Sequence, residues 1–297
     1  MTLIEADQAT DIYDEMGPAM EMSGGSAANT IAAFAGMGGK CAFIGKVADD
    51  QLGNVFHHDI SATGAYFNTP PLKDSLPTAR CLIMVTPDAE RTMCTFLGAS
   101  VWISEGDIDK DLVSRSKVTY MEGYLFDKPK AKKAFLKAAE LAHEANQKVA
   151  LSLSDPFCVN RHREEFLHLV EGHVDILFAN EEEICSLYQV KDLEIALSEI
   201  SGKCEIVVVT QGSKGATVVT NDGRINVPAQ PVSNVIDTTG AGDLYAAGFL
   251  YGFTQGKPLK ICAKYGTIAA GEVIQHMGAR VQGDFTNLLN DDQVVYD

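Results

Sequence analysis

The segment Asp237–Asp243 (Asp-Thr-Thr-Gly-Ala-Gly-Asp) joins residues that could bind an anion to one that could accept a proton. The apolar stretch Leu244–Gly252 follows directly and reads as a helix. A small-residue turn that enters a helix leaves backbone N–H groups unpaired, and these donors together with the helix dipole attract a phosphate. Asp243 lies where this anion site begins. A base beside an anion hole suits a reaction that deprotonates a hydroxyl while a phosphoryl group arrives in line with it.

The segment Ser23–Asn29 is a second glycine-containing turn, and it leads into a predicted helix over Thr30–Gly36. The paired Gly24 and Gly25 let a ligand approach the main chain. Asn29 lies about one turn into the helix, where its amide could hydrogen-bond a pair of hydroxyls. Because no cation stands beside these glycines in the sequence, the set favours an uncharged polyol-like substrate. A plain helix start, capped by a serine, is the alternative.

Two further segments follow predicted strands. Asn180 and Glu183 come directly after the strand Ile176–Ala179 and, at i and i+3, share a face from which they could organise Mg²⁺ and its waters. Acidic residues also occur in a first helical turn simply because they suit the dipole. Thr210–Gly215 follows the apolar run Glu205–Thr210 and suits either a nucleotide-binding loop or an ordinary hairpin turn.

Strand and helix patterns alternate from about Lys117 onward, which indicates a parallel sheet flanked by helices. The region 65–100 differs, because the β-rich stretches Ala79–Thr86 and Thr92–Leu97 flank a turn and read as a hairpin. A hairpin inserted in an α/β chain is expected to cover the strand ends where ligands bind. We therefore predict a single domain over residues 1–297 with a small lid.

The composition limits the classes of partner. Of 297 residues, 40 are acidic and 24 basic, and the formal net charge of −16 argues against a nucleic acid or an anionic membrane as partner. The seven cysteines include no C-x-x-C pair, so we expect free thiols and a cytoplasmic location. No apolar run reaches the ~18 residues of a membrane span. The motifs of P-loop proteins, dinucleotide-binding folds, serine hydrolases and protein kinases are also absent from the sequence.

With these motifs, the chain resembles the ribokinase-like (PfkB) family of carbohydrate and nucleoside kinases over nearly its whole length. The heptad Asp237–Asp243 is the most specific part, and Gly-Gly-Ser-x-x-Asn at 24–29 and Asn-x-x-Glu at 180–183 support it in the family's order. Ribokinases typically carry a lysine where this chain has Ser26, which makes the chain most similar to the adenosine kinases and their bacterial relatives. The resemblance implies an α/β ribokinase-like fold, with a mostly parallel central sheet flanked by helices and a small β lid.

The resemblance also implies roles for individual residues. Asp243 would be the base, beside an anion hole formed by Gly240, Ala241 and Gly242. The substrate's sugar hydroxyls would be held by Gly24, Gly25, Ser26 and Asn29, with Arg91 as a candidate lid contact. ATP and Mg²⁺ would be held by Thr210, Gly212, Gly215, Asn180, Glu183, His276 and Gly278. K⁺ or another monovalent cation would be held around Asp237 and Thr239.

One feature departs from the family pattern. Family members begin with a strand, often Gly-x-x-x-x-Asp, whose aspartate binds the substrate's sugar hydroxyls. Met1–Glu5 already resembles the segment that precedes the paired glycines. We therefore expect this strand to be missing, through natural shortening or through a start assigned to an internal methionine, and substrate affinity to be reduced.

The leading hypothesis is ATP-dependent phosphorylation of a nucleoside's primary hydroxyl, with adenosine first, giving AMP and ADP as in purine salvage. A sugar kinase acting on ribose, fructose or a keto-deoxy sugar acid is one alternative. A catalytically silent nucleoside-binding protein is another, although retention of the whole Asp237–Asp243 heptad argues against it. The sequence leaves open whether the protein is a monomer or a homodimer.

Overall fold

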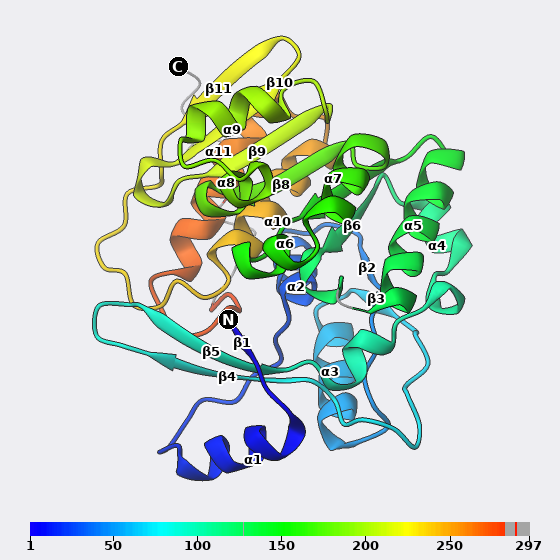
Figure 1. Ribbon diagram of the computed structural model, residues 1–297. Coiled ribbons are helices and arrows are strands. Elements are labelled where there is room, and N and C mark those ends of the chain that lie inside the picture. Colours follow the sequence, from blue (N-terminus) through cyan, green and yellow to red (C-terminus); the bar gives the residue numbers. More distant parts are fainter. Residues whose placement is uncertain (127, 283–288, 290–297) are drawn as a thin grey trace.

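The strands after Lys117 assemble into one six-stranded sheet with the order β11-β10-β9-β8-β7-β6, of which β11 was not indicated by the sequence (Figure 1). The computed structural model describes residues 1–126, 128–282 and 289, so the end of the predicted domain lies outside the described residues. The strands are β6 (Val118–Glu122), β7 (Lys148–Ser152), β8 (Ile176–Asn180), β9 (Ile206–Thr210), β10 (Ala216–Thr220) and β11 (Gly223–Val227). Neighbours from β6 to β9 are parallel, whereas β10 and β11 are antiparallel additions.

The sheet is apolar on both faces, and successive residues of a strand enter different cores, as side-chain alternation requires. Leu177 packs in one core with residues from α5 (Pro129–Glu144), α6 (Pro156–Arg161), α7 (Arg163–Gly172), α8 (Glu181–Tyr188) and α9 (Leu193–Ile200). Its neighbours Ile176 and Phe178 pack in the other core with α10 (Ala241–Thr254) and α11 (Leu259–Val273). The predicted α/β fold, with a mostly parallel central sheet flanked by helices, is therefore confirmed.

The helix α2 (Ser26–Gly36) packs against α10. It begins four residues earlier than the predicted Thr30, since Gly25, with φ of 98°, turns the chain into the helix at Ser26. Glycine adopts this backbone region without the steric cost that a side chain brings. The second glycine turn is consequently joined directly to the helix that touches α10.

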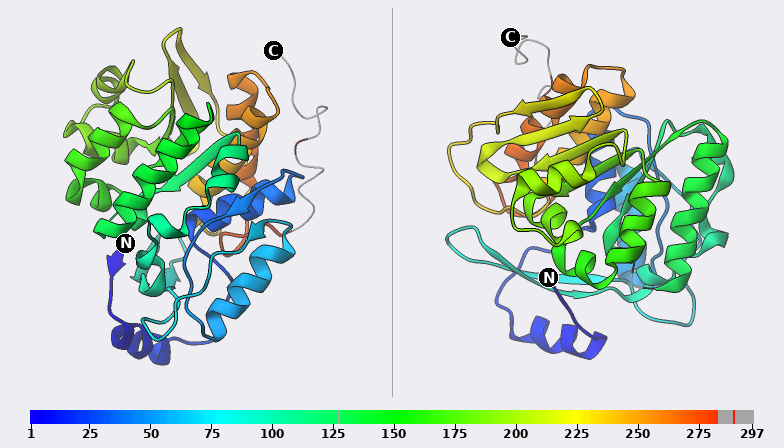
Figure 2. Two further views of the ribbon diagram at one scale, coloured as in Figure 1. Left: turned by 90° about the vertical axis from the view of Figure 1, so that its right-hand side faces the viewer. Right: turned by 45° about the horizontal axis from the view of Figure 1, so that its top comes forward.

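The lid is a separate three-stranded sheet of order β1-β5-β4, in which β4 (Arg80–Val85) and β5 (Arg91–Phe96) form the predicted antiparallel hairpin. The strand β1 (Thr2–Leu3) pairs in parallel with β5, although the sequence indicated no strand there; it belongs to the lid and not to the six-stranded sheet. The helix α1 (Ala6–Glu15) contacts both hairpin strands. Figures 1 and 2 show the hairpin running beneath the main body, with α1 on its far side.

Shorter elements complete the described chain. A two-stranded parallel sheet of β2 (Ala42–Phe43) and β3 (Tyr66–Phe67) packs with α3 (Gln51–Ala62), and α4 (Lys110–Arg115) contacts α5. Single 3₁₀ turns lie at η1 (Gly98–Trp102), η2 (Glu105–Asp107), η3 (Gly123–Leu125) and η4 (Gly212–Lys214). Within the described ranges, none of the helices has the length and apolar character needed to cross a bilayer.

Candidate active site

A large cleft of about 2500 Å³ lies between the lid and the carboxyl ends of the parallel strands. Single small-molecule pockets usually measure ~300–1,000 Å³, so this cleft has room for two ligands side by side. All but one of the residues predicted for the site line it: Gly24, Gly25, Ser26, Asn29, Arg91, Asn180, Glu183, Thr210, Gly212, Gly215, Asp237, Thr239, Gly240, Ala241, Gly242, Asp243 and Gly278. Segments far apart in the sequence thus meet at one place.

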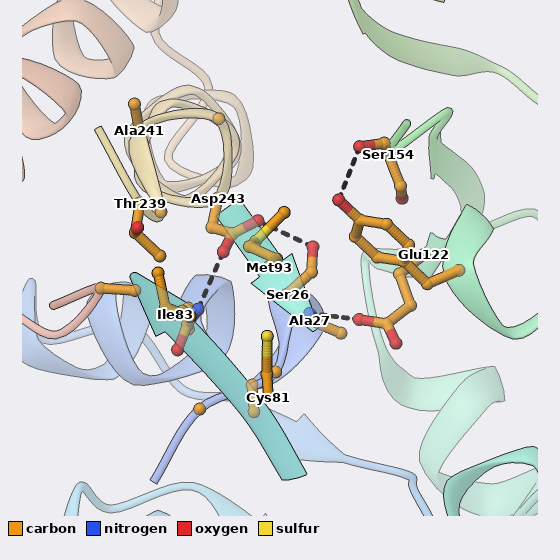
Figure 3. A pocket seen from close by; sticks show the side chains of 18 of the residues that line it. Ser26, Ala27, Cys81, Ile83, Met93, Glu122, Ser154, Thr239, Ala241 and Asp243 are labelled. Carbon is orange, nitrogen blue, oxygen red and sulfur yellow. Dashed lines mark hydrogen bonds between the residues drawn. The ribbon is translucent and has the colours of Figure 1, made fainter. Parts of the chain in front are cut away.

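Asp243, in the first turn of α10, is held by the first turn of α2. Its Oδ1 accepts a hydrogen bond from Ser26 Oγ at 2.7 Å, and its Oδ2 accepts one from Asn29 Nδ2 at 2.8 Å (Figure 3). Thr30 Oγ1 also donates to the backbone oxygen of Asp243 at 3.1 Å. The base predicted for the reaction and the residues predicted for the substrate therefore orient one another.

Burial raises the pKa of Asp243 above the usual aspartate value of 3.8. The hydrogen bonds from Asn29 and Ser26 oppose this rise, as do the positive charges of Arg91 and Arg280. Burial disfavours the charged carboxylate, whereas donors and nearby cations favour it. A raised pKa makes the carboxylate a stronger proton acceptor than an exposed aspartate.

The turn before α10 presents free backbone donors, as predicted, although not all of those expected. Gly240 has φ of 81°, and an added Cβ would lie 2.6 Å from the Cβ of Ala279, so this position requires glycine. Within the described part of the chain, the N–H groups of Gly242 and Asp243 have no acceptor. The prediction for Ala241 is wrong in this respect, because its N–H donates to the Thr238 oxygen at 3.2 Å.

Asp237 organises the start of the same turn. It is 2% exposed, and its Oδ1 accepts hydrogen bonds from the N and Oγ1 of Thr239 at 2.8 and 2.6 Å. Its Oδ2 accepts one from the N of Gly278 at 2.9 Å. Burial alone would raise the pKa of Asp237, but these bonds together with the charge of Arg91 hold it below the usual value. Asp237 is therefore a firmly ionised carboxylate.

Arg91 connects the lid to this turn. It lies at the start of β5, and its Nη1 donates a hydrogen bond to Thr238 Oγ1. Arg91 is the one lid residue that the sequence analysis singled out. Its contact with Thr238 places the guanidinium beside the turn that carries the free amides of Gly242 and Asp243. A guanidinium at this place adds positive charge to the anion hole.

The turn Ser23–Gly25 is fixed by residues that the sequence did not single out. Ser23 Oγ donates to Asp59 Oδ2 at 2.6 Å, and Arg280 Nε donates to the Ser23 backbone oxygen at 3.0 Å. Although no cation stands beside the paired glycines in the sequence, the fold brings Arg280 next to them. Arg280 lies 257 positions further along the chain, so no local pattern could have revealed it.

Glu122, at the end of β6, is a second functional candidate that the sequence did not reveal. Its Oε2 accepts a hydrogen bond from the N of Ala27 at 2.6 Å (Figure 3). Burial, with a further contribution from the charge of Asp243, raises the pKa of Glu122 to about 7, against the hydrogen bond from Ala27. The only available signal was its place at the carboxyl end of a parallel strand.

Asn180 and Glu183 form a reciprocal helix cap at the start of α8. Asn180 Oδ1 accepts from the N of Glu183 at 2.8 Å, and the Glu183 carboxylate accepts from the N and Nδ2 of Asn180 at 3.0 and 2.8 Å. Glu183 is 6% exposed, and burial raises its pKa to about 7. The sequence did not indicate this cap, and both residues also line the cleft.

The predicted nucleotide loop lies beside this cap, because Thr210 pairs with Asn180 between β9 and β8. Gly212 and Gly215 have φ of 56° and 99°, and an added Cβ at Gly215 would lie 2.0 Å from the Val227 oxygen. The prediction for His276 is wrong. Its side chain turns back to Glu272, with 3.2 Å between Nε2 and Oε1, and does not line the cleft, unlike Gly278.

Comparisons with known proteins show the family to which the chain belongs. The pfkB family carbohydrate kinase description matches residues 10–284. The crystal structure of adenosine kinase from Sinorhizobium meliloti is similar over 98% of this chain and 89% of that chain, with 49% sequence identity and a TM-score of 0.96.

Two other relatives carry the names of a sugar kinase and of an adenosine kinase. A probable sugar kinase from Rhizobium etli CFN 42 is similar over 99% of this chain and 90% of that chain, with 48% identity and a TM-score of 0.96. The adenosine kinase of Saccharomyces cerevisiae is 27% identical over 92% of this chain and 84% of its own length. The family match covers most of the chain, and the fold of this chain is shared with the similar solved structures. The chain therefore belongs to the pfkB family of carbohydrate kinases, enzymes that transfer a phosphoryl group to a hydroxyl.

Proposed function

We propose that the protein phosphorylates the primary hydroxyl of a nucleoside with ATP, and that adenosine is its substrate, giving AMP and ADP. The observation that carries this proposal is the place of Asp243, whose carboxylate lies beside unpaired backbone amides and is hydrogen-bonded to Ser26 and Asn29. The name and 49% identity of the Sinorhizobium meliloti adenosine kinase support the choice of substrate.

In the proposed reaction, Asp243 accepts the proton of the acceptor hydroxyl. The oxygen of that hydroxyl forms a bond to the γ-phosphorus, the bond from phosphorus to the bridging oxygen breaks, and ADP leaves with the electron pair. The amides of Gly242 and Asp243 and the guanidinium of Arg91 lie where they would stabilise the negative charge on the transferred group. Closure of the lid over the acceptor would exclude water and so limit ATP hydrolysis.

Glu183 is the residue we assign to Mg²⁺, through a bound water. Mg²⁺ usually keeps several waters and needs only one or two protein carboxylates together with substrate phosphates. The donor set fits this use, since Glu183 lines the cleft next to Asn180, and Thr210 and Gly212 lie on the neighbouring strand end. The ion would offset the phosphate charge, and Glu183 would fix where its water shell sits.

Asp237 and Thr239 are the residues we assign to a monovalent cation such as K⁺. A carboxylate offers about four lone-pair sites, and Asp237 uses three of them for the bonds from Thr239 and Gly278. One site remains, and the carboxylate is ionised. A cation here would stiffen the turn that presents the free amides.

The inner face of the lid supports a nucleoside over a small sugar acid. Cys81, Ile83 and Met93 come from the lid strands and line the cleft near Ser26 (Figure 3). Such side chains offer contact area to a flat base but few hydrogen bonds to extra hydroxyls or a carboxylate. The similarity to a probable Rhizobium etli sugar kinase keeps a sugar substrate as the second candidate.

The cysteines of the described chain are all free thiols, which supports a cytoplasmic location. A role in purine salvage follows only from the proposed substrate. We propose that the protein acts as a monomer or a homodimer on small molecules. The strongly acidic composition supports the absence of a nucleic-acid partner.

A coupled assay of ADP release tests the proposal. Purified protein with ATP, MgCl₂ and KCl is offered adenosine, guanosine, ribose, fructose or a keto-deoxy sugar acid. We expect turnover with adenosine at a kcat/KM at least ~100-fold above that for each sugar, because the apolar lid face contacts the base. Turnover of ribose or fructose without turnover of adenosine would contradict the substrate assignment.

A further inference from the structure

The helix α2 lacks a cap of its own. Its N-cap residue is Gly25, which has no side chain, and no side-chain hydrogen bond is made from that position. By contrast, α8 and α9 are capped by the side chains of Asn180 and Asp192. The first N–H groups of any helix need an acceptor from outside the helix, and a missing cap usually destabilises the helix start.

Glu122 supplies the missing acceptor from another element. Its Oε2 accepts from the N of Ala27, the second residue of α2, at 2.6 Å. A carboxylate at a helix N-terminus combines a charge-assisted hydrogen bond with a favourable interaction with the helix dipole. Because Gly25 has no side chain, the acceptor for this helix start comes from Glu122 at the end of β6.

The first turn of α2 consequently lies between two carboxylates. Glu122 holds the backbone of Ala27 from one side, whereas Asp243 accepts from the side chains of Ser26 and Asn29 on the other (Figure 3). These contacts fix both the position of the turn and its rotation about the helix axis. The Gly24–Gly25 turn directly precedes this point in the chain.

We propose that Glu122 is a positioning residue for the phosphoryl acceptor, because it caps α2 from β6 and so sets Ser26 and Asn29 against Asp243. The part of this inference that concerns the acceptor rests on the proposed function. The capping itself does not, and it can be measured without any substrate.

The charges around Glu122 support this role. The titratable groups that face it are Asp243 from α10, Tyr120 from β6 itself and Tyr124 from the turn after β6. Since its pKa is about 7, Glu122 gains a proton as the pH falls through neutrality. A neutral carboxyl is a weaker acceptor than a carboxylate, so the cap weakens in acid.

Two variants separate capping from bulk packing. Glu122→Gln keeps an oxygen that can accept from Ala27, whereas Glu122→Leu removes it. Asp192→Leu is the matched control, because Asp192 caps α9 at an exposed place by accepting from the N of Glu194 at 2.8 Å. All three are compared with the wild type by hydrogen exchange over residues 24–30 and by steady-state kinetics with adenosine and ATP.

We expect Glu122→Leu to exchange about tenfold faster in the first turn of α2 and to raise the KM for the acceptor about tenfold. The KM for ATP should change less than about twofold. In Glu122→Gln, both the exchange rate and the KM for the acceptor should stay close to the wild-type values. Asp192→Leu should lower the stability of the protein but change neither the exchange rate in the first turn of α2 nor the KM for the acceptor. Unchanged exchange in Glu122→Leu, or equal exchange in the two Glu122 variants, would overturn the capping.

Other outcomes separate the two proposals. Faster exchange in Glu122→Leu, with no turnover of adenosine by the wild type, keeps the cap and contradicts the proposed function. Faster exchange with an unchanged acceptor KM overturns the positioning role. If Glu122→Leu fails to fold, hydrogen exchange of the wild-type protein serves instead. The amide of Ala27, which donates to Glu122, should exchange at least about tenfold more slowly than the amides of Gly242 and Asp243, which have no acceptor in the described part of the chain, and equal exchange would overturn the capping.

Discussion

Asn29 Nδ2 donates a 2.8 Å hydrogen bond to Asp243 Oδ2 although the two residues lie 214 positions apart in the chain. One belongs to the turn predicted to hold the acceptor and the other is the predicted base. Their contact means that the acceptor site and the proton acceptor form one unit, built where α2 packs on α10. A change in either partner should therefore alter proton transfer as well as binding.

The pH dependence of Ser26→Ala tests this unit. Ser26 Oγ donates to Asp243 Oδ1 at 2.7 Å and favours the ionised carboxylate, whose pKa burial raises. Without this donor the pKa of Asp243 should rise further, so the acid limb of kcat/KM should move to higher pH. Ser198→Ala, at an exposed serine of α9, is the control and should leave the limb in place. A limb that stays put or moves to lower pH in Ser26→Ala would count against the proton-acceptor role.

Arg91→Ala should lower kcat/KM by about 10- to 100-fold, the range expected when a hydrogen bond to a charged group is lost. The reason is that Arg91 bonds to Thr238 and adds positive charge at the edge of the anion hole. Arg224→Ala breaks an ion pair with Glu194 on the body of the protein and should have little effect. Steady-state kinetics of both variants give the comparison. If they behaved alike, the lid contact would have no part in the reaction.

Glu183→Gln should make stability less dependent on pH. Burial raises the pKa of Glu183 from 4.5 to about 7, so the folded protein holds its proton more tightly than the unfolded chain does. That contribution to stability is complete below pH 4.5 and is lost as the pH rises through about 7. Thermal unfolding between these pH values should show a smaller loss in Glu183→Gln. Glu164→Gln, at an exposed position of α7, is the control and should keep the slope of the wild type. An equal slope in all three proteins would contradict the raised pKa of Glu183.

Gly240→Ala and Gly242→Ala should separate the shape of the turn from access to its amides. At Gly240, with φ of 81°, a Cβ would lie 2.6 Å from that of Ala279, so we expect Gly240→Ala to lose stability by ~1–2 kcal/mol or more. At Gly242 a Cβ meets nothing within 4 Å, so the fold should keep its stability. The Gly242→Ala variant should nevertheless lose activity, because its added methyl group enters the space in front of the free amides of residues 242 and 243. Full activity in Gly242→Ala would show that no phosphoryl group approaches there.

The sequence predicts the inner strands of the central sheet well, because strands such as Ile206–Thr210 show their burial directly in their composition, whereas the mostly exposed edge strand β11 does not. It also predicts the hairpin, since turn residues separate two β-rich stretches. Alternation of side chains does not reveal that β1 joins the lid, because a strand of two residues carries no periodic signal.

The site was predictable where chemistry and local turn geometry coincide, as in Asp237–Asp243. Glu122 and Arg280 were missed because each acts on a backbone group of a distant segment, and such contacts leave no mark on spacing. His276 was misplaced because its ring bonds to Glu272, one helical turn earlier in the chain, instead of facing the cleft. The pairing of the Ala241 amide likewise depends on the shape of the turn, which composition alone does not determine.

The most direct test is the kcat of Asp243→Asn with ATP and adenosine, measured by ADP release. The variant keeps the size of the side chain but cannot take the hydroxyl proton, so we predict a loss of about 10²- to 10⁴-fold or more. Calorimetric binding of adenosine and an unchanged unfolding temperature would show that the cleft is intact. A kcat within about tenfold of the wild type in a folded, adenosine-binding variant would contradict the role of Asp243 as the base.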